Sequence, residues 1–448
     1  MRLRLFSADW VLPVTSPPIR AGAVAIDNNR IVFVGTQEEA ASRADLAGAE
    51  NVKLGCSAVV PGFVNVHSHL ELTVMRGFLE DLPFRDWIRK LTRSKYEQLT
   101  ADEMAASAVL GAAEAVRSGI TTIADTGDTD SAFKALLRTG LRGIAYREVF
   151  GPDTIDAAKS LEGLKGKVAA MREQATEKVR VGVSPHAPYT VSGDLFRRVT
   201  EYALQETLDV CIHAAESESE QRMMVTGDGE FVEALKARGI TWQAPGSSTI
   251  SYFDSIGVLN SSPLLVHCVR ADTADVEVIA RTGSRVAHCP KSNAKLGHGI
   301  AKLRQIMDAG VPVGLGTDSV ASNNRGDLID EMRFCGLIHR AQSQDFRWPA
   351  PDQLLKLATL GGAKVLGLDR EIGSLEAGKQ ADLTAIDLSG THNTPLHDPT
   401  AAIVFSAGAS DIRLTMVGGE VLFDGRDVKS VDEHELRATL NDAFTRMS

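Results

Sequence analysis

Two histidines one residue apart, His67 and His69, follow the short apolar run of residues 64–66. In an extended strand alternate side chains point to the same face, so one divalent ion can bind both imidazoles. An isolated pair of this kind also occurs as two surface or core histidines. Because two imidazoles make only half a metal site, the pair predicts a metal only if other parts of the chain supply further ligands.

Further residues that bind metals well stand at the ends of other short apolar runs. They are His186, His213, His267, His288 and Asp318. Together with the run before His67, six of eight apolar runs end in a histidine or an aspartate, which packing alone does not explain. If the runs are parallel strands of one barrel, their carboxyl ends meet on one rim. The pattern therefore predicts a single site on that rim.

The spacing of the runs indicates strands that alternate with helices from Pro61 onward. We expect strands ending at His67 and near residues 120–124, 142–149, 179–184, 209–213, 263–267, 285–288 and 312–316. Thr100 and Glu103 form a capping box that begins a helix, and Gly119 ends it. Eight strands over roughly 300 residues predict a (β/α)8 TIM barrel. A doubly wound sheet is the alternative, but the glycine-rich loops typical of that fold are missing from the sequence.

Strands are also indicated on both sides of this region. Residues 24–26 and 31–34 flank a hairpin turn, and strands return at 381–387, 413–417 and 421–423 before a helix at 431–446. The sequence therefore predicts an α/β protein with two domains. We expect a barrel over residues 59–369 and a small β-sandwich domain built from both termini, residues 1–58 and 370–448.

Composition narrows the possible partners and the compartment. The net charge of -10 comes without a basic patch, which argues against nucleic acid or an anionic membrane and leaves a small-molecule substrate. The five cysteines are an odd number with no Cys-x-x-Cys motif, which is typical of free thiols in a reducing compartment. Asp9 interrupts a short apolar run that would make a poor signal peptide, and no apolar window is long enough for a transmembrane helix. We expect a soluble, cytoplasmic protein.

Several segments together resemble the amidohydrolase superfamily. The branch they resemble contains the adenosylhomocysteine and methylthioadenosine deaminases, the aminodeoxyfutalosine deaminases and the triazine chlorohydrolases. The segments are PGFVNVHSHLE, MRGFLEDLPFRDWI, SPHAPYT, HAAESESE, LVHC, HCPKSNAKLGHG, GLGTDSVASNN and GSLEAGKQADLTAID. The resemblance runs through nearly the whole chain and implies a metal-dependent hydrolase that forms a homo-oligomer.

The resemblance implies one metal ion, Zn²⁺ or alternatively Fe²⁺. Its ligands would be His67, His69, His213 and Asp318. The strands offer no lysine suited to a carbamylated bridge, so we expect one ion. Three imidazoles and a carboxylate suit a borderline ion and leave a position for water, whose pKa the ion lowers toward 7.

Three residues would perform the chemistry in a member of this family. Asp318 would take the proton of the attacking water, and Glu216 would protonate a ring nitrogen and pass protons to the leaving group. His267 would hydrogen-bond the water or the developing tetrahedral centre. Because loss of ammonia from an aromatic amidine requires a proton on the ring nitrogen, Glu216 favours a deaminase, an aminohydrolase, over a chlorohydrolase.

The resemblance also suggests an adenine-containing nucleoside as substrate. Glu97, about one residue from the position expected for a glutamate that binds ribose hydroxyls, is one candidate contact. Arg147 would contact the 5′ substituent or form an ion pair with Glu148, and His186 is either a substrate contact or a core histidine. The motifs around His69 and His186 favour 6-aminodeoxyfutalosine, an intermediate of menaquinone biosynthesis. Adenosylhomocysteine or methylthioadenosine comes second, and a guanine, cytosine or triazine-like substrate third.

The remaining histidines have simpler interpretations. His288 supports the loop after the seventh strand, and His298 lies in a glycine-flanked loop that can face either way. We expect four others on the surface: His339, His392, His397 and His434. A barrel that has lost catalysis and serves as a scaffold is the alternative of a different class, but such relatives usually lack one or more metal ligands.

Overall fold

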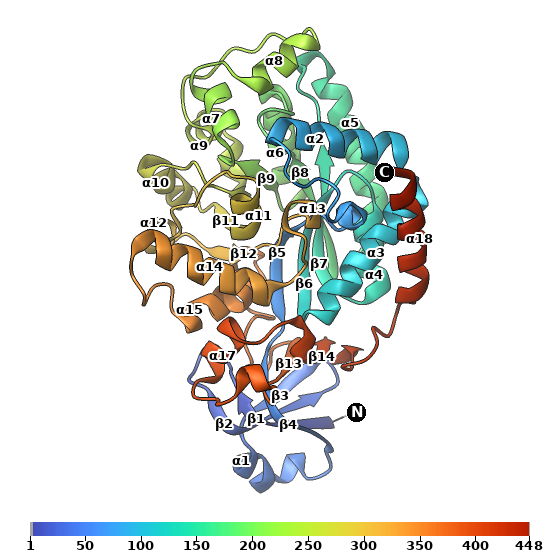
Figure 1. Ribbon diagram of the computed structural model, residues 1–448, viewed down its shortest axis with the longest axis vertical. Coiled ribbons are helices and arrows are strands. Elements are labelled where there is room, and N and C mark those ends of the chain that lie inside the picture. The colour runs from blue at the N-terminus through green and yellow to red at the C-terminus, as the bar shows by residue number, and fades with distance from the viewer. Residues whose placement is uncertain (1–2, 448) are drawn as a thin grey trace.

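The computed structural model describes residues 3–447, and its upper part in Figure 1 is a barrel. Its strands are β5 (Phe63–Ser68), β6 (Ile120–Gly127), β7 (Arg142–Val149), β8 (Val179–Pro185), β9 (Cys211–Ala214), β10 (Leu264–His267), β11 (Arg285–His288) and β12 (Val313–Leu315). They form two parallel four-stranded sheets, β5 to β8 and β9 to β12. Backbone bridges from Ser68 to Asp318 and from Val183 to Val210 join the sheets into a closed barrel.

Helices surround the barrel, most of them between successive strands and the last four after β12. They are α2 (Phe84–Arg93), α3 (Ala101–Arg117), α4 (Ser131–Thr139), α5 (Ala157–Arg172), α6 (Gly193–Glu206), α7 (Glu218–Val225), α8 (Glu230–Ala237), α9 (Thr249–Ser255), α10 (Thr273–Arg281), α11 (Pro290–Lys295), α12 (Leu303–Asp308), α13 (Val320–Asn323), α14 (Leu328–Ser343), α15 (Pro351–Lys356) and α16 (Gly362–Val365). The predicted capping box begins α3, where the Thr100 side chain accepts a hydrogen bond from the Glu103 amide. No helix among residues 3–447 is long and apolar enough to cross a membrane.

Alternation along the barrel strands divides the core into two layers. Ile144 and Tyr146 of β7 point into the barrel and pack with Val66 and Val266. Ala145, from the same strand, belongs to the larger cluster shared with the surrounding helices. This alternation of side chains fixes which strand-end residues can reach the barrel mouth.

The lower part in Figure 1 is a seven-stranded sheet built from both ends of the chain. It contains β1 (Leu3–Val11), β2 (Ile19–Asp27), β3 (Arg30–Thr36), β4 (Glu50–Pro61), β13 (Leu383–Asp387), β14 (Ile412–Val417) and β15 (Glu420–Phe423), with α1 (Gln37–Ser42) and α17 (Pro399–Phe405). Phe6 and Val24 of the early strands share one apolar cluster with Leu383 and Met416 of the late strands. The predicted α/β barrel with a small β domain from both termini is confirmed, and the part predicted as a β-sandwich is a single seven-stranded sheet.

The helix after this sheet, α18 (Glu433–Met447), returns to the barrel. It lies along α3 at the edge of the molecule in Figure 1. Leu440 and Ala443 pack with Leu72 and Met75, which belong to the segment directly after His69. Residues 433–447 are therefore associated with the barrel in space, whereas the division of the chain into residues 1–58 with 370–448 and 59–369 stays a prediction.

A buried ion pair joins the barrel to the sheet. Arg142 at the start of β7 donates from Nε to Asp382 Oδ2 at 2.8 Å and from Nη2 to Oδ1 at 3.1 Å. Both side chains are almost fully buried. Asp382 also accepts a 2.6 Å hydrogen bond from the Gly418 amide, so one carboxylate ties together three segments.

We expect Asp382→Ala to lower the free energy of unfolding by about 3 kcal/mol, because it leaves the buried Arg142 guanidinium without a partner. Urea unfolding of the whole chain measures the loss. The matched control is Glu371→Ala, which removes an exposed bridge to Arg30 of 3.3 Å and should cost less than about 1 kcal/mol. Equal losses in the two variants would contradict a special role for the buried pair.

Candidate metal centre and catalytic cavity

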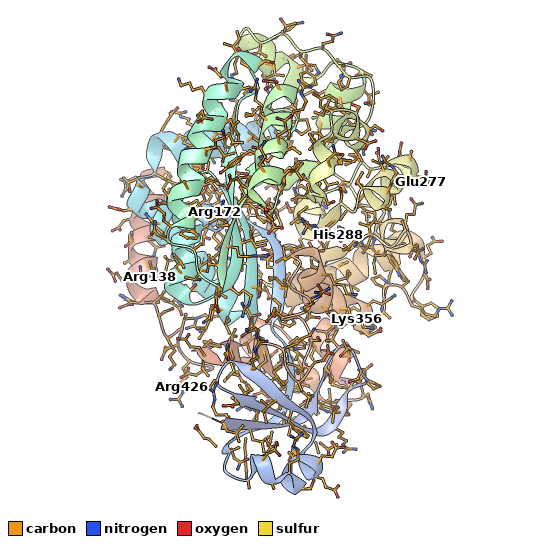
Figure 2. The ribbon with its side chains drawn as sticks, turned by 180° about the vertical axis from the view of Figure 1, so that it is seen from behind. Arg138, Arg172, Glu277, His288, Lys356 and Arg426 are labelled. Carbon is orange, nitrogen blue, oxygen red and sulfur yellow. The ribbon has the colours of Figure 1, made fainter. Side chains whose placement is uncertain are left out.

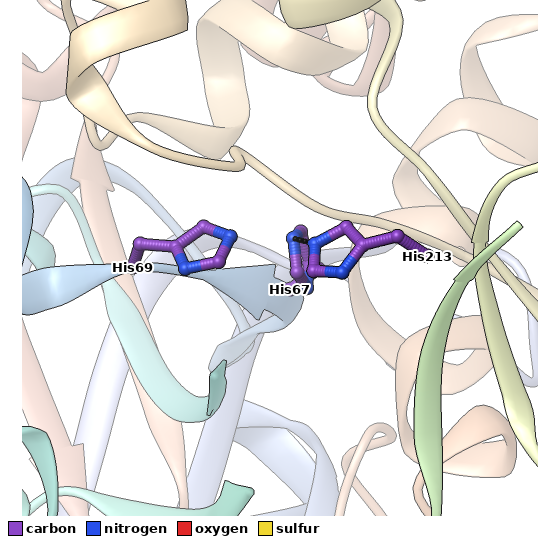
Figure 3. Close-up of side chains that lie close together, drawn as sticks. All are labelled: His67, His69 and His213. Atoms are coloured by element: carbon purple, nitrogen blue, oxygen red, sulfur yellow. Dashed lines mark hydrogen bonds between the residues drawn. The ribbon is translucent and has the colours of Figure 1, made fainter. Parts of the chain in front are cut away.

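Three histidines meet at the carboxyl ends of β5 and β9. Figure 3 shows His69 and His213 on either side of His67. The Nε2 atoms of His67 and His213 are 3.3 Å apart. The ring centres of His67 lie 4.8 Å from His69 and 4.9 Å from His213. The strand alternation predicted for the His67 and His69 pair thus gives two imidazoles that face a third.

Asp318 completes this group from the residues after β12. Its Oδ1 lies 3.3 Å from His67 Nε2 and 3.4 Å from His69 Nε2. Asp318 adopts a positive φ of 55°, a conformation that L-residues seldom adopt, and its amide donates a 2.9 Å hydrogen bond to the His67 carbonyl. Ser292 and Ser322 donate hydrogen bonds of 2.5 and 3.0 Å to Oδ2. The second oxygen is therefore fixed while Oδ1 points at the histidines.

The charge states of these groups fit a divalent metal. Burial lowers the pKa of His69 to about 3 and lowers that of His213 well below its usual value, so both rings are neutral and keep a lone pair. Burial raises the pKa of Asp318, but His67 and the other nearby imidazoles outweigh it and the pKa lies well below normal. Neutral imidazoles and an ionised carboxylate are the forms that bind zinc. His67, His69 and His213 form one group that could hold an ion, and Asp318 Oδ1 lies within 3.4 Å of two of them.

A buried carboxyl group lies beside the histidines. Glu216 Oε1 is 3.5 Å from His267 Nε2 and 3.4 Å from His298 Nε2. Burial raises the pKa of Glu216, but the two imidazoles outweigh it and bring the pKa below its usual value. The carboxyl group lies where it can exchange a proton with a molecule bound beside the histidines. His298, whose direction the sequence left open, faces this site.

Two neighbours hold Glu216 and His267 in place. Asn293 Oδ1 accepts a 2.9 Å hydrogen bond from His267 Nδ1, which leaves Nε2 directed at Glu216. The Glu220 carboxyl accepts hydrogen bonds from the amides of Ala215 and Glu216 at 2.7 and 3.0 Å. Asn293 lies in the segment after β11 and Glu220 lies four residues beyond Glu216. The sequence contained these positions but no pattern that assigned their roles.

A cavity of about 480 Å³ opens from these residues toward solvent, and we call it the rim cavity. His69, His213, Glu216, His267 and Asp318 form its inner end. Helix α2 forms its apolar wall with residues at i, i+3, i+4 and i+7, which are Phe84, Trp87, Ile88 and Leu91. No residue of α2 is fully buried. The four apolar side chains line the rim cavity and do not pack wholly into the protein core. Exposed Arg238 lies on the cavity wall as well.

Of the three predicted substrate contacts, only His186 lies at the rim cavity. Its ring centre is 4.7 Å from that of His213, and Thr190 hydrogen-bonds its Nδ1 at 2.8 Å. Glu97 projects into solvent with 65% of its side chain exposed and lies 3.3 Å from Arg93, so the prediction of a ribose contact does not fit. Arg147 is buried but does not line the cavity, because it shares the outward direction of Ala145 on β7. The assignment of Arg147 to the 5′ substituent therefore also fails.

Residues close to Glu97 and Arg147 in the sequence reach the rim cavity instead. Glu148 lines it, and its buried Oε1 has no hydrogen-bond partner. Burial raises the pKa of Glu148 well above its usual value, which favours the protonated, neutral carboxyl. Lys95 and Tyr96 also line the cavity, where Lys95 forms ion pairs with Glu71 and Asp128. Strand alternation on β7 was the signal that could have selected Glu148 over Arg147.

One of the histidines expected on the surface is buried. His392, His397 and His434 are exposed, as predicted. His339 is only 2% exposed, because α14 turns it toward the barrel wall, where its Nε2 lies 3.0 Å from His288 Nε2. The surface prediction for His339 was therefore wrong.

Comparison with known proteins shows similarity over most of the chain. The amidohydrolase family model matches residues 58–422. A Moorella thermoacetica protein named 5-methylthioadenosine/S-adenosylhomocysteine deaminase is 32% identical over 432 residues, which are 96% of each chain. An adenosine deaminase structure from Xanthomonas campestris with bound zinc has a TM-score of 0.88 and 28% identity over 99% of this chain and 98% of that one.

A more distant solved structure shares the fold. The aminofutalosine deaminase of Helicobacter pylori, in complex with methylthio-coformycin, has a TM-score of 0.80 over 94% of this chain and 100% of that one. Its sequence identity is 20%, so the likeness supports the architecture alone.

Proposed function

The chain belongs to the amidohydrolase family and is a hydrolase that acts on carbon–nitrogen bonds, and we propose that it deaminates a 5′-substituted adenosine at a single metal ion. The observation that carries the proposal is the position of Glu216. A buried carboxylate with two imidazoles beside it lies next to a set of three histidines and an aspartate, at the inner end of a largely apolar cavity. Such a cavity suits a flat heteroaromatic ring.

We propose His67, His69, His213 and Asp318 as the metal ligands, with zinc as the preferred ion. When bound, the ion lowers the pKa of a water molecule toward 7 and so supplies a nucleophile at neutral pH. The four donor groups suit zinc because they combine nitrogen with a single oxygen ligand and leave one position open. The Xanthomonas campestris structure, with its bound zinc, supports the choice.

In this mechanism Asp318 takes the first proton of the attacking water as the bond from oxygen to purine C6 forms. Glu216, in its protonated form, protonates ring nitrogen N1. The C6–N bond then breaks, and the amino group leaves as ammonia with the proton that Asp318 held. The remaining hydroxyl proton returns to the Glu216 carboxylate. His267 Nε2 points into the same space and contacts the tetrahedral centre.

The rim cavity and the relatives bear on the substrate. The apolar wall of α2 suits a methylthio group, and the Moorella thermoacetica relative is named for methylthioadenosine and adenosylhomocysteine. We therefore place these two nucleosides first. Exposed Arg238 can pair with a carboxylate at the end of a longer 5′ arm, which keeps aminodeoxyfutalosine as the second candidate. This ranking of substrates is the reverse of the one that the sequence motifs favoured, in which aminodeoxyfutalosine came first.

Ammonia release by the zinc-loaded protein tests the proposal. The panel contains methylthioadenosine, adenosylhomocysteine, aminodeoxyfutalosine, adenosine, guanine and a chlorotriazine. We expect the highest kcat/KM for methylthioadenosine or adenosylhomocysteine. Activity on guanine or the triazine, with none on the adenosines, would refute the proposed substrate class.

Glu148 is proposed to contact the nucleoside. Burial favours the protonated carboxyl and Oε1 lacks a partner, so the group is suited to both donate and accept a hydrogen bond. We expect Glu148→Ala to raise KM roughly tenfold with a smaller change in kcat, which corresponds to one lost hydrogen bond. Glu148→Gln should restore most of the affinity, since an amide has the same hydrogen-bonding groups. Steady-state kinetics with the best substrate measure both values.

The matched control for Glu148→Ala is Glu97→Ala, which removes an exposed carboxylate outside the cavity. We expect an unchanged KM. A larger rise in KM for Glu97→Ala than for Glu148→Ala would show that Glu97, and not Glu148, contacts the nucleoside.

A further inference from the structure

A second group of metal-binding side chains lies outside the rim cavity, between β11 and α14. It consists of His288, Cys335 and His339, which we call the β11–α14 cluster. Their ligand atoms all lie within 4.8 Å of one another. The three residues are 1%, 0% and 2% exposed, and none of them lines the rim cavity. The candidate metal centre described above uses none of the three.

The fold brings these residues together from two rigid elements. On β11, Ala287 packs inside the barrel, so His288 points outward toward the helices. Figure 2 labels His288 among the elements of the barrel, away from the small sheet. Cys335 and His339 are four residues apart on α14 and so share the face that packs on the barrel. Neither element needs to move for the three side chains to meet.

The distances match those of the first group of histidines. His288 Nε2 lies 3.0 Å from His339 Nε2, compared with 3.3 Å between His67 and His213. Two nitrogens bound to one tetrahedral zinc ion at about 2.05 Å lie roughly 3.3 Å apart. The spacing of both pairs therefore suits imidazoles that share an ion.

A hydrogen bond between the two Nε2 atoms is the alternative to a shared ion, and it would leave the Cys335 thiol out of the cluster. The buried Nδ1 of His288 has no hydrogen-bond partner in either case. Burial lowers the pKa of His339 to about 4 and lowers that of His288 well below normal, so both rings keep a free lone pair.

We propose that His288, Cys335 and His339 bind a second divalent ion of the zinc class, which fastens α14 to the barrel wall. Two imidazoles and a thiolate suit zinc or cobalt, with water in the fourth position. Cys335 loses its thiol proton to solvent when the ion binds, because a coordinated sulfur is a thiolate. The site has a structural role and is independent of the proposed deaminase reaction.

Cobalt(II) titration tests the proposal with a signal that the first site cannot give. The whole chain is stripped of metal by chelation and titrated under anaerobic conditions, followed by absorption and by metal analysis. We expect two cobalt ions per chain and a thiolate-to-cobalt charge-transfer band in the near ultraviolet. The first site contains only nitrogen and oxygen ligands, so the band reports sulfur coordination alone.

Cys335→Ser is expected to abolish the band and to reduce the count to one ion. Cys289→Ser is the matched control, because Cys289 is also buried and free but packs inside the barrel. It should leave the band unchanged. One cobalt ion per chain and no band in the folded wild-type protein would overturn the proposal and leave a hydrogen-bonded histidine pair. A band that persists in Cys335→Ser would overturn it as well.

Discussion

Glu216→Gln is expected to lower kcat for deamination about 10³-fold while the metal content stays unchanged. The amide keeps the size of the carboxyl but cannot deliver a proton to the ring nitrogen, and proton transfer of this kind contributes about 10²- to 10⁴-fold. Glu216 is not among the proposed ligands, so the ion should remain. Steady-state ammonia release and metal analysis on the same preparation measure the two effects.

Glu218→Gln is the control for this variant, because Glu218 lies two residues further along the same segment and is exposed. It should keep the wild-type rate. Full activity in Glu216→Gln would exclude the proposed proton transfer. Loss of the metal together with the activity would instead make Glu216 a ligand.

Asp318→Asn should lower turnover by about 10⁴-fold, even in molecules that retain the ion. Asparagine cannot accept the proton of the attacking water, and its amide group would meet the hydroxyls of Ser292 and Ser322 that now donate to Oδ2. Turnover is expressed per bound metal ion, so that weaker metal binding does not imitate a chemical defect. Asp308→Asn, at an exposed aspartate on the surface, controls for the loss of one charge.

Normal turnover per ion in Asp318→Asn would show that another group takes the proton. Glu216 would then be the remaining carboxylate at the inner end of the rim cavity. The double variant with Glu216→Gln would separate the two assignments.

The barrel and its rim could be predicted from the sequence because each signal is local. An apolar run that ends in a histidine or aspartate marks a strand and its carboxyl end, as for His213 near the end of β9. Thr100 and Glu103 marked the start of α3 in the same way. The family assignment made from these motifs is confirmed by the match over residues 58–422.

The substrate contacts could not be predicted because they depend on the direction of a side chain. A π-helical turn at Ser94–Gln98 shifts the helical phase, so Lys95 and Tyr96 face the rim cavity and Glu97 faces solvent. On β7 a difference of one residue decides between Glu148 and Arg147. His339 was missed for another reason, since its partner His288 lies 51 residues away.

The position of α18 has a consequence for how the molecule is completed during synthesis. The segment that carries His69 emerges from the ribosome early, but Leu440 and Ala443, which cover its apolar neighbours Leu72 and Met75, emerge hundreds of residues later. Contacts so distant in sequence form late, because closing a long loop costs entropy before it gains any packing. His67 and His69, two of the proposed metal ligands, therefore stay on an uncovered segment until residues 440–443 have been made, and metal capture should follow the packing of α18.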